Sequence, residues 1–222
     1  MKLNCDLGEG AGSEAAVMPF IDQANIACGG HAGDLESMRT TMALAKQHRV
    51  RIGAHPGYPD LENFGRVSMK LSTEEIGILV SEQVGALAKL GEVDYVKPHG
   101  ALYHDMMQDD GILAAIRDAI GDRPLLIQSR PVVPDNGAGL MFEAFADRRY
   151  TDLGELQPRK EAGSVLSEDD ILDQVRLLAM EGVVETISGS RMLLQADSLC
   201  VHGDNPVGVR LIPAIREILN NA

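Results

Sequence analysis

The sequence predicts a single-domain α/β protein, a parallel (β/α)7-type barrel, from three observations. Short apolar segments alternate with longer segments of helical periodicity, which is typical of parallel strands joined by crossover helices. Several apolar segments end in Asp, His or Lys beside glycine, and a barrel gathers such strand ends at one mouth, whereas an open sheet concentrates its site at one switch point. With 222 residues and 45% hydrophobic side chains, the chain can bury one full core.

Seven apolar segments are expected to form the barrel strands. They lie near residues 2–6, 22–28, 51–55, 94–98, 124–128, 141–146 and 198–202. Since no repeat, low-complexity segment or linker divides them, the predicted domain spans residues 1–222. The segment richest in turn-forming residues, Arg130 to Gly137, is interpreted as an excursion of this domain.

Capping residues and apolar periodicity indicate the helices between these strands. Three helices are predicted to begin after a capping side chain, at Asp34, Ser72 and Ser167. An acid follows each of the two serines three residues later, which is the signature of a capping box or a close variant of it. The first of these helices is expected over Leu35 to His48, and the last helix of the chain over Val209 to Leu219, with a bend at Pro213.

Composition excludes several classes of protein. A formal net charge of −13 with scattered basic residues argues against binding to nucleic acid. The chain has no apolar run of the roughly 18 residues that a membrane span needs and no signal-like N-terminal segment, so a cytoplasmic location is expected. Cys5, Cys28 and Cys200 are odd in number and lie in predicted strands, which predicts reduced, buried thiols without a catalytic role.

Six ionisable side chains near predicted strand ends are the catalytic candidates: Asp6, His31, His55, Lys97, His99 and His202. Asp6 has the chemistry of a general base, a metal ligand or a helix cap. Burial of the Lys97 cation is costly, so it is expected to bind an anion or to have a lowered pKa. Lys97 and His99 lie two residues apart and are expected to face the same water-filled mouth, where they would contribute to catalysis more than to folding.

Other charged residues are open to more than one interpretation. Glu143 lies within an apolar strand, which predicts an interior carboxylate with a raised pKa. Arg148 and Arg149 either hold a carboxylate substrate or pair with Asp147. The glycine-rich run from Gly8 to Gly12 matches neither the dinucleotide fingerprint nor a P-loop, so a nucleotide site there has little support.

Seven motifs follow one another along the chain: residues 4–9, 24–34, 52–60, 64–66, 96–103, 145–148 and 200–204. Together they resemble the LamB/YcsF family nearly end to end. The resemblance implies a seven-stranded barrel similar to polysaccharide deacetylases. It also implies ATP-dependent opening of the 5-oxoproline lactam to L-glutamate, as one subunit of a 5-oxoprolinase that also contains subunits B and C.

The resemblance further implies roles for individual residues. Substrate contacts would come from Asn25, Glu143, Arg148 and Asp204. Because the chain has no P-loop, phosphorylation of the lactam by ATP would belong at least partly to the companion subunits. The chain differs from the usual family pattern at Gly30, at residues 10–12 and at His104, and it is contracted near residues 85–95 and 128–136, so its pocket lining is expected to differ.

Two other functions remain open at this stage. A stand-alone metal-dependent amide hydrolase or deacetylase would use Asp6 with His31, His55 or His99 to hold a divalent ion that activates water. These residues lie on separate strands, so the fold would have to assemble the site. The other alternative is a regulatory subunit that binds a small acid without turnover. The sequence does not determine the oligomeric state, and a homo-oligomer is one option.

Overall fold

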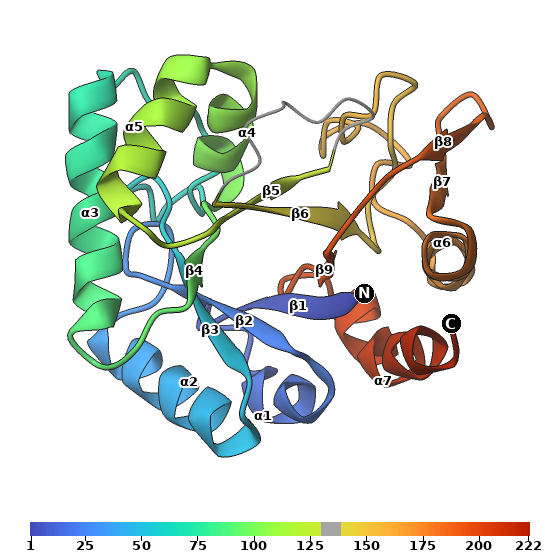
Figure 1. The fold of residues 1–222 in the computed structure, drawn as a ribbon, viewed down its shortest axis with the longest axis horizontal. Helices are drawn as coiled ribbons and strands as arrows, with labels where there is room; N and C mark the ends of the chain where they lie inside the picture. Colours follow the sequence, from blue (N-terminus) through green and yellow to red (C-terminus); the bar gives the residue numbers. More distant parts are fainter. Residues whose placement is uncertain (130–138) are drawn as a thin grey trace.

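The computed structural model describes residues 1–129 and 139–222, and in these residues seven parallel strands close into a barrel (Figure 1). The barrel strands are β1 (Lys2–Leu7), β2 (Gln23–Ala27), β3 (Arg51–His55), β4 (Tyr95–Val96), β5 (Leu125–Gln128), β6 (Leu140–Phe145) and β9 (Ser198–Val201). They are ordered β1-β2-β3-β4-β5-β6-β9, and pairing of β9 with β1 closes the ring. The predicted (β/α)7-type barrel and all seven strand positions are confirmed.

Helices surround this barrel on its outside (Figure 1). They are α1 (Glu14–Val17), η1 (Met18–Phe20), α2 (Leu35–His48), α3 (Thr73–Ala88), α4 (Gly100–Gln108), α5 (Asp110–Ile120), α6 (Glu168–Glu181) and α7 (Pro206–Asn221). A short antiparallel pair, β7 (Val183–Glu185) with β8 (Arg191–Leu193), lies outside the ring beside α6. Among the described residues, no helix combines the length and the apolarity that a membrane span requires.

The predicted caps are confirmed at the helix starts. The side chain of Asp34 accepts a hydrogen bond from the backbone N–H of Ser37, and Ser72 forms a full capping box with Glu75. The side chain of Ser167 caps α6. These bonds satisfy backbone N–H groups that the first helical turn leaves without partners, which is why each helix begins where it does.

Two features of the helical layer differ from the prediction. The last helix begins at Pro206, not Val209, because the side chain of Asn205 accepts hydrogen bonds from the N–H groups of Val207 and Gly208. Pro213 lies inside that helix. No helix was predicted between β4 and β5, where the chain forms α4 and α5, with Asp109 capping the second of them. The predicted excursion from Arg130 to Gly137 lies outside the described residues.

Alternate residues of each strand point into the barrel, and several of these inward residues are polar. Asn4 on β1 donates hydrogen bonds to Ser198 (2.7 Å) and Glu143 (3.2 Å). Asn25 on β2 donates to the Asn4 side chain at 2.8 Å and accepts from the Tyr95 hydroxyl at 2.6 Å. Leu3, Cys5 and Leu7 alternate with the inward residues of β1 and join the hydrophobic core. A connected polar layer therefore supports the end of the barrel where the candidate residues lie.

Candidate active site

The six candidate residues lie together at the carboxyl ends of the barrel strands. Contacts link five of them directly: Asp6 to Lys97 and His55, His55 to His99, and His99 to His31. His202 joins through a group in which ligand atoms of Asp6, Cys200 and His202 lie within 4.8 Å of one another. The structure thus brings the sequence-predicted residues into one cluster at one mouth.

Lys97 is the buried cation of this cluster. Its Nζ atom lies 3.0 Å from Oδ1 of Asp6, 3.2 Å from Oε2 of Glu143 and 3.0 Å from Sγ of Cys200. Burial disfavours the charged form, but Asp6, Cys200 and Glu143 together outweigh it and raise the pKa of Lys97 well above its usual range. The expectation of a water-filled setting is wrong, since the side chains of Lys97 and His99 are only 3% and 8% exposed.

The pKa values of the two carboxyl groups beside Lys97 are shifted in opposite directions. Although burial raises the pKa of a carboxyl group, Lys97 and His55 outweigh it at Asp6 and hold the pKa of Asp6 well below its usual range. Burial dominates at Glu143, so its pKa is raised, as the sequence predicted. Glu143 also accepts a hydrogen bond from the Tyr103 hydroxyl at 2.9 Å. Asp6 is therefore the anionic partner of Lys97, and Glu143 completes the buried network.

Glu9 is a site residue that the sequence analysis did not single out. Its Oε1 atom lies 2.9 Å from Nε2 of His31, 3.3 Å from Nδ1 of His99 and 3.7 Å from Nε2 of His55. Gly8 and Gly10 on either side of it have positive φ, which turns the chain after β1 back toward the mouth. The sequence feature that could have identified it is an acid between two glycines, three residues beyond Asp6. The sequence analysis considered this glycine-rich run only as a possible phosphate-binding loop.

The three histidine rings are packed against one another, and two of them are held by backbone carbonyls. The rings of His31 and His99 stack with centroids 3.6 Å apart, and His55 meets both of them edge-on. Nδ1 of His55 lies 2.6 Å from the carbonyl oxygen of Lys97, and Nε2 of His99 lies 3.0 Å from that of Phe64. Burial and the two neighbouring histidines lower the pKa of His55 to about 3 despite the nearby carboxylates.

His202 forms a separate pair with Asp147. Its Nδ1 lies 2.8 Å from Oδ1 of Asp147, whose other oxygen accepts from Asn205 at 2.8 Å. Burial alone would raise the pKa of Asp147, but His202 and Asn205 outweigh it and lower the pKa. The structure thus gives Asp147 a partner other than the two arginines: Arg149 pairs with Asp170 at 3.6 Å, and Arg148 donates to two backbone carbonyls.

The predicted substrate-binding residues are all held by other protein groups. Asn25 is buried and donates to Asp6 at 2.8 Å, so it positions this carboxylate. Asp204 pairs with Arg66 and, at 3.0 Å, with Arg159. Both arginines are partly exposed, and Arg66 lies over the ring of Phe64, whose carbonyl contacts His99. With Arg148, whose pKa is lowered by burial and then by these two neighbours, they form the arginine group beside the mouth.

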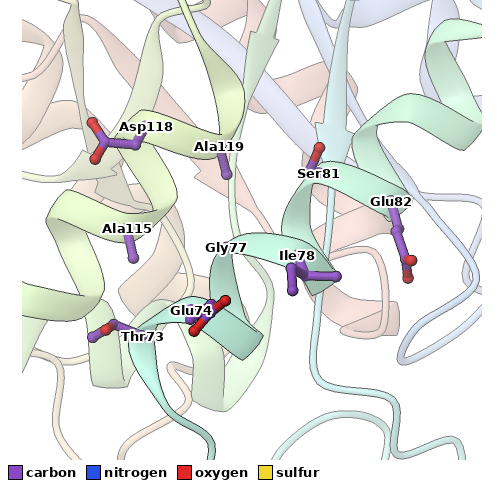
Figure 2. A pocket seen from close by; sticks show the side chains of 9 residues that line it. All are labelled: Thr73, Glu74, Gly77, Ile78, Ser81, Glu82, Ala115, Asp118 and Ala119. Carbon is purple, nitrogen blue, oxygen red and sulfur yellow. The ribbon is translucent and has the colours of Figure 1, made fainter.

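Two grooves lie on the outer layer. One, of about 570 Å³, lies between α3 and α5 and is lined by Ile78 and Ala115 among others (Figure 2). The other, of about 440 Å³, is lined by Gly30 and Gln83 among others, and Gly30 directly precedes His31 in the sequence. The Gln83 amide bonds the backbone of Gly57 and fills the space where a side chain at position 30 would stand, which explains how the chain tolerates glycine there.

The family model of the LamB/YcsF family matches residues 1–222. The A subunit of a 5-oxoprolinase from Vibrio campbellii is 49% identical over 239 residues, covering 99% of this chain and 95% of that protein. A protein of the same name from Pseudomonas fluorescens is 46% identical, covering 98% of this chain and 96% of that protein.

Solved structures agree with these sequence relatives. A lactam utilization protein from Thermus thermophilus superposes with a TM-score of 0.87 at 34% identity, covering 100% of this chain and 96% of that one. A family 4 carbohydrate esterase from Streptomyces lividans has a TM-score of 0.55 at 10% identity, covering 100% and 88%, and shares the fold alone. This chain belongs to the LamB/YcsF family.

Proposed function

We propose that this chain is the A subunit of a multi-subunit 5-oxoprolinase and that its barrel opens the 5-oxoproline lactam to L-glutamate. The observation that carries the proposal is the 49% identity to the A subunit of another 5-oxoprolinase over nearly the full length of both chains. We assign residues 1–222 to one catalytic domain that works in the cytoplasm with companion subunits B and C. ATP supplies the activation of the ring, as an activated amide is far easier to hydrolyse.

The substrate carries one carboxylate, which needs a cation in the mouth. Lys97 is unsuited to this task because it is already paired with Asp6 and Glu143. Arg66 and Arg159 are partly exposed and share one carboxylate, that of Asp204, so they retain positive charge for an anionic ligand. We therefore place the substrate carboxylate at the arginine group, where the nearby Arg148 adds positive charge.

Opening of the phosphorylated ring requires water to add to the lactam carbon, the C–N bond to break, the leaving nitrogen to gain a proton and inorganic phosphate to depart. Glu9 and the histidines around it are the groups that would orient the water and take its proton. His202 would deliver the proton to nitrogen, because the contact of its Nδ1 with Asp147 fixes the orientation of the ring. Lys97 keeps Asp6 ionised and places a positive field beside the developing oxyanion.

The nucleotide is assigned to the companion subunits. Residues 8–12 lack the P-loop pattern, and the glycines at 8 and 10 turn the chain so that Glu9 reaches the histidines. A carboxylate in that loop repels a triphosphate, which is a further reason to place ATP elsewhere. On this proposal the barrel receives an activated ring and completes its opening.

The test is release of glutamate from 5-oxoproline by the purified chain, with and without subunits B and C and with and without ATP. The proposal predicts turnover only when all three subunits and ATP are present. Turnover by the isolated chain without ATP would replace it with a stand-alone amide hydrolase. If this chain binds 5-oxoproline but a complex of subunits B and C is fully active without it, the chain is a regulatory subunit.

A further inference from the structure

We infer that Glu9, His31, His55 and His99 form a binding site for one divalent transition-metal ion of the zinc type. Each residue offers one ligand atom, and these atoms lie within 4.8 Å of one another. The distances from Oε1 of Glu9 to the three histidine nitrogens run from 2.9 to 3.7 Å. Ligands about 2.0–2.1 Å from a tetrahedral ion stand roughly 3.3–3.5 Å from one another, a separation that lies within this spread.

The hydrogen bonds of two rings determine where their lone pairs point. Carbonyl oxygens only accept, so Nδ1 of His55 donates its N–H to the Lys97 carbonyl, and Nε2 of His99 donates to that of Phe64. In a neutral ring the other nitrogen then has no hydrogen. Nε2 of His55 and Nδ1 of His99 therefore face each other across 3.0 Å with their lone pairs converging. Metal-binding histidines show this same arrangement, with the distal N–H on a backbone carbonyl.

The third ring is held in place by close packing. Nδ1 of His31 is buried and has no hydrogen-bond partner in the described part of the chain. The backbones of Gly57 and Gly65 lie against this ring, and a Cβ at either position would come 2.6 Å from an atom of His31. The ring also stacks on His99, so its Nε2 is directed at Glu9. Three nitrogens and one carboxylate oxygen thus lie within 4.8 Å of one another, and a divalent cation between them would relieve the repulsion between their lone pairs.

The neighbouring group of Asp6, Cys200 and His202 is a weaker site. Nζ of Lys97 lies 3.0 Å from both Oδ1 of Asp6 and Sγ of Cys200, so an ammonium cation already stands between them. A second cation there would meet the charge of Lys97, whereas the Glu9 carboxylate has no lysine or arginine among its ion-pair partners in the described residues. In the proposed reaction these four residues would then act by holding the ion, which would orient the water, and would not take its proton themselves. Metal binding is measured directly, so the test of this site does not depend on the lactam chemistry.

The experiment is calorimetric titration of the chelator-stripped full chain with zinc chloride. One zinc ion per chain is expected. Glu9→Gln and His99→Ala are each expected to weaken binding by about tenfold or more, since even the loss of a residue that only supports a metal ligand costs about 10–100-fold. His104→Ala, which changes an exposed histidine outside the cluster, and Cys200→Ser are the matched controls and should leave the affinity unchanged. Unchanged affinity in Glu9→Gln, or loss of binding in Cys200→Ser, would overturn the assignment.

X-ray absorption of the zinc-loaded wild-type chain provides a readout that needs no variant to fold. The expected first shell contains only nitrogen and oxygen, with scattering from several imidazole rings. Sulfur in that shell would place the ion at a cysteine and refute the site, as would failure of the wild-type chain to retain zinc. Circular dichroism of each variant without metal separates loss of a ligand from loss of the fold.

Discussion

The ammonium group of Lys97 lies 3.0 Å from the carboxylate of Asp6, although 91 residues separate them in the chain. Asp6 comes from β1, Lys97 follows β4, and the second carboxylate partner, Glu143, lies on β6. One cation therefore ties three strands together inside the barrel. Removing one member of a buried ion pair leaves the other uncompensated, which makes this network the most sensitive electrostatic feature of the fold.

Lys97→Met is expected to lower the free energy of unfolding by about 3–5 kcal/mol, because it leaves Asp6 and Glu143 facing each other without a cation. Denaturant unfolding at neutral pH measures this change. Lys70→Met is the control, since Lys70 is exposed and its substitution should stay within about 0.5 kcal/mol. Adding Glu143→Gln to Lys97→Met should recover part of the loss, and a double variant less stable than the single one would contradict the account.

His99→Ala is expected to reduce the rate of glutamate release by about a hundredfold or more in the complex with its companion subunits, as removal of a proton-transfer or water-orienting group does. Its cost in stability should be about 1–2 kcal/mol, since the ring gives up hydrogen bonds to one carbonyl and one histidine. Melting curves and initial rates separate the two effects. His104→Ala should retain the wild-type rate, and a similar loss there would remove the special role of His99.

Asp22 is predicted to make the fold sensitive to acid. It accepts hydrogen bonds from Leu3 N–H at 2.8 Å and from Arg216 at 2.6 Å, and these outweigh burial and lower its pKa. A carboxyl group with a lowered pKa stabilises the fold fully above its unfolded pKa, about 3.9, and loses that contribution as pH falls further toward the folded pKa.

The measurement is the difference in unfolding free energy between wild type and Asp22→Asn across pH. Wild type should be the more stable protein at pH 6, and the difference should shrink steadily below about pH 4. A difference that stays constant down to pH 2.5 would show that the charge of Asp22 does not contribute. Because Asp22 lies away from the mouth, the activity of the variant at neutral pH serves as a check that the site is intact.

Gly203→Ala is expected to destabilise the protein by about 1–3 kcal/mol and to reduce activity, because an added methyl group collides with the carbonyl oxygen of Asp6. Gly85→Ala is the matched control. A methyl group at Gly85, within α3, meets nothing within 4 Å, so it should stabilise the helix by about 1 kcal/mol. Equal melting temperatures for the two variants would show that the contact with Asp6 has no consequence.

Local sequence was sufficient for the elements of the fold. Alternating apolar segments predicted the seven strands, and Asp34, Ser72 and Ser167 predicted three helix starts, because a cap and an apolar period depend on residues within one or two turns. The polar residues at the strand ends predicted which side chains would gather at the mouth. Parallel strands in a closed barrel all present their carboxyl ends at the same face, so this inference needed the fold class and nothing more.

Only the tertiary structure decided how those residues pair. The recruitment of Glu9 by three histidines, the burial of Lys97 between two carboxylates and the pairing of Asp147 with His202 depend on the stagger of strands around the ring and on the turn at Gly8 and Gly10. Such contacts join residues far apart in the chain, from 22 positions for Glu9 and His31 to 91 for Asp6 and Lys97. A local pattern specifies that a side chain faces inward, but the closure of the barrel determines which side chain it meets.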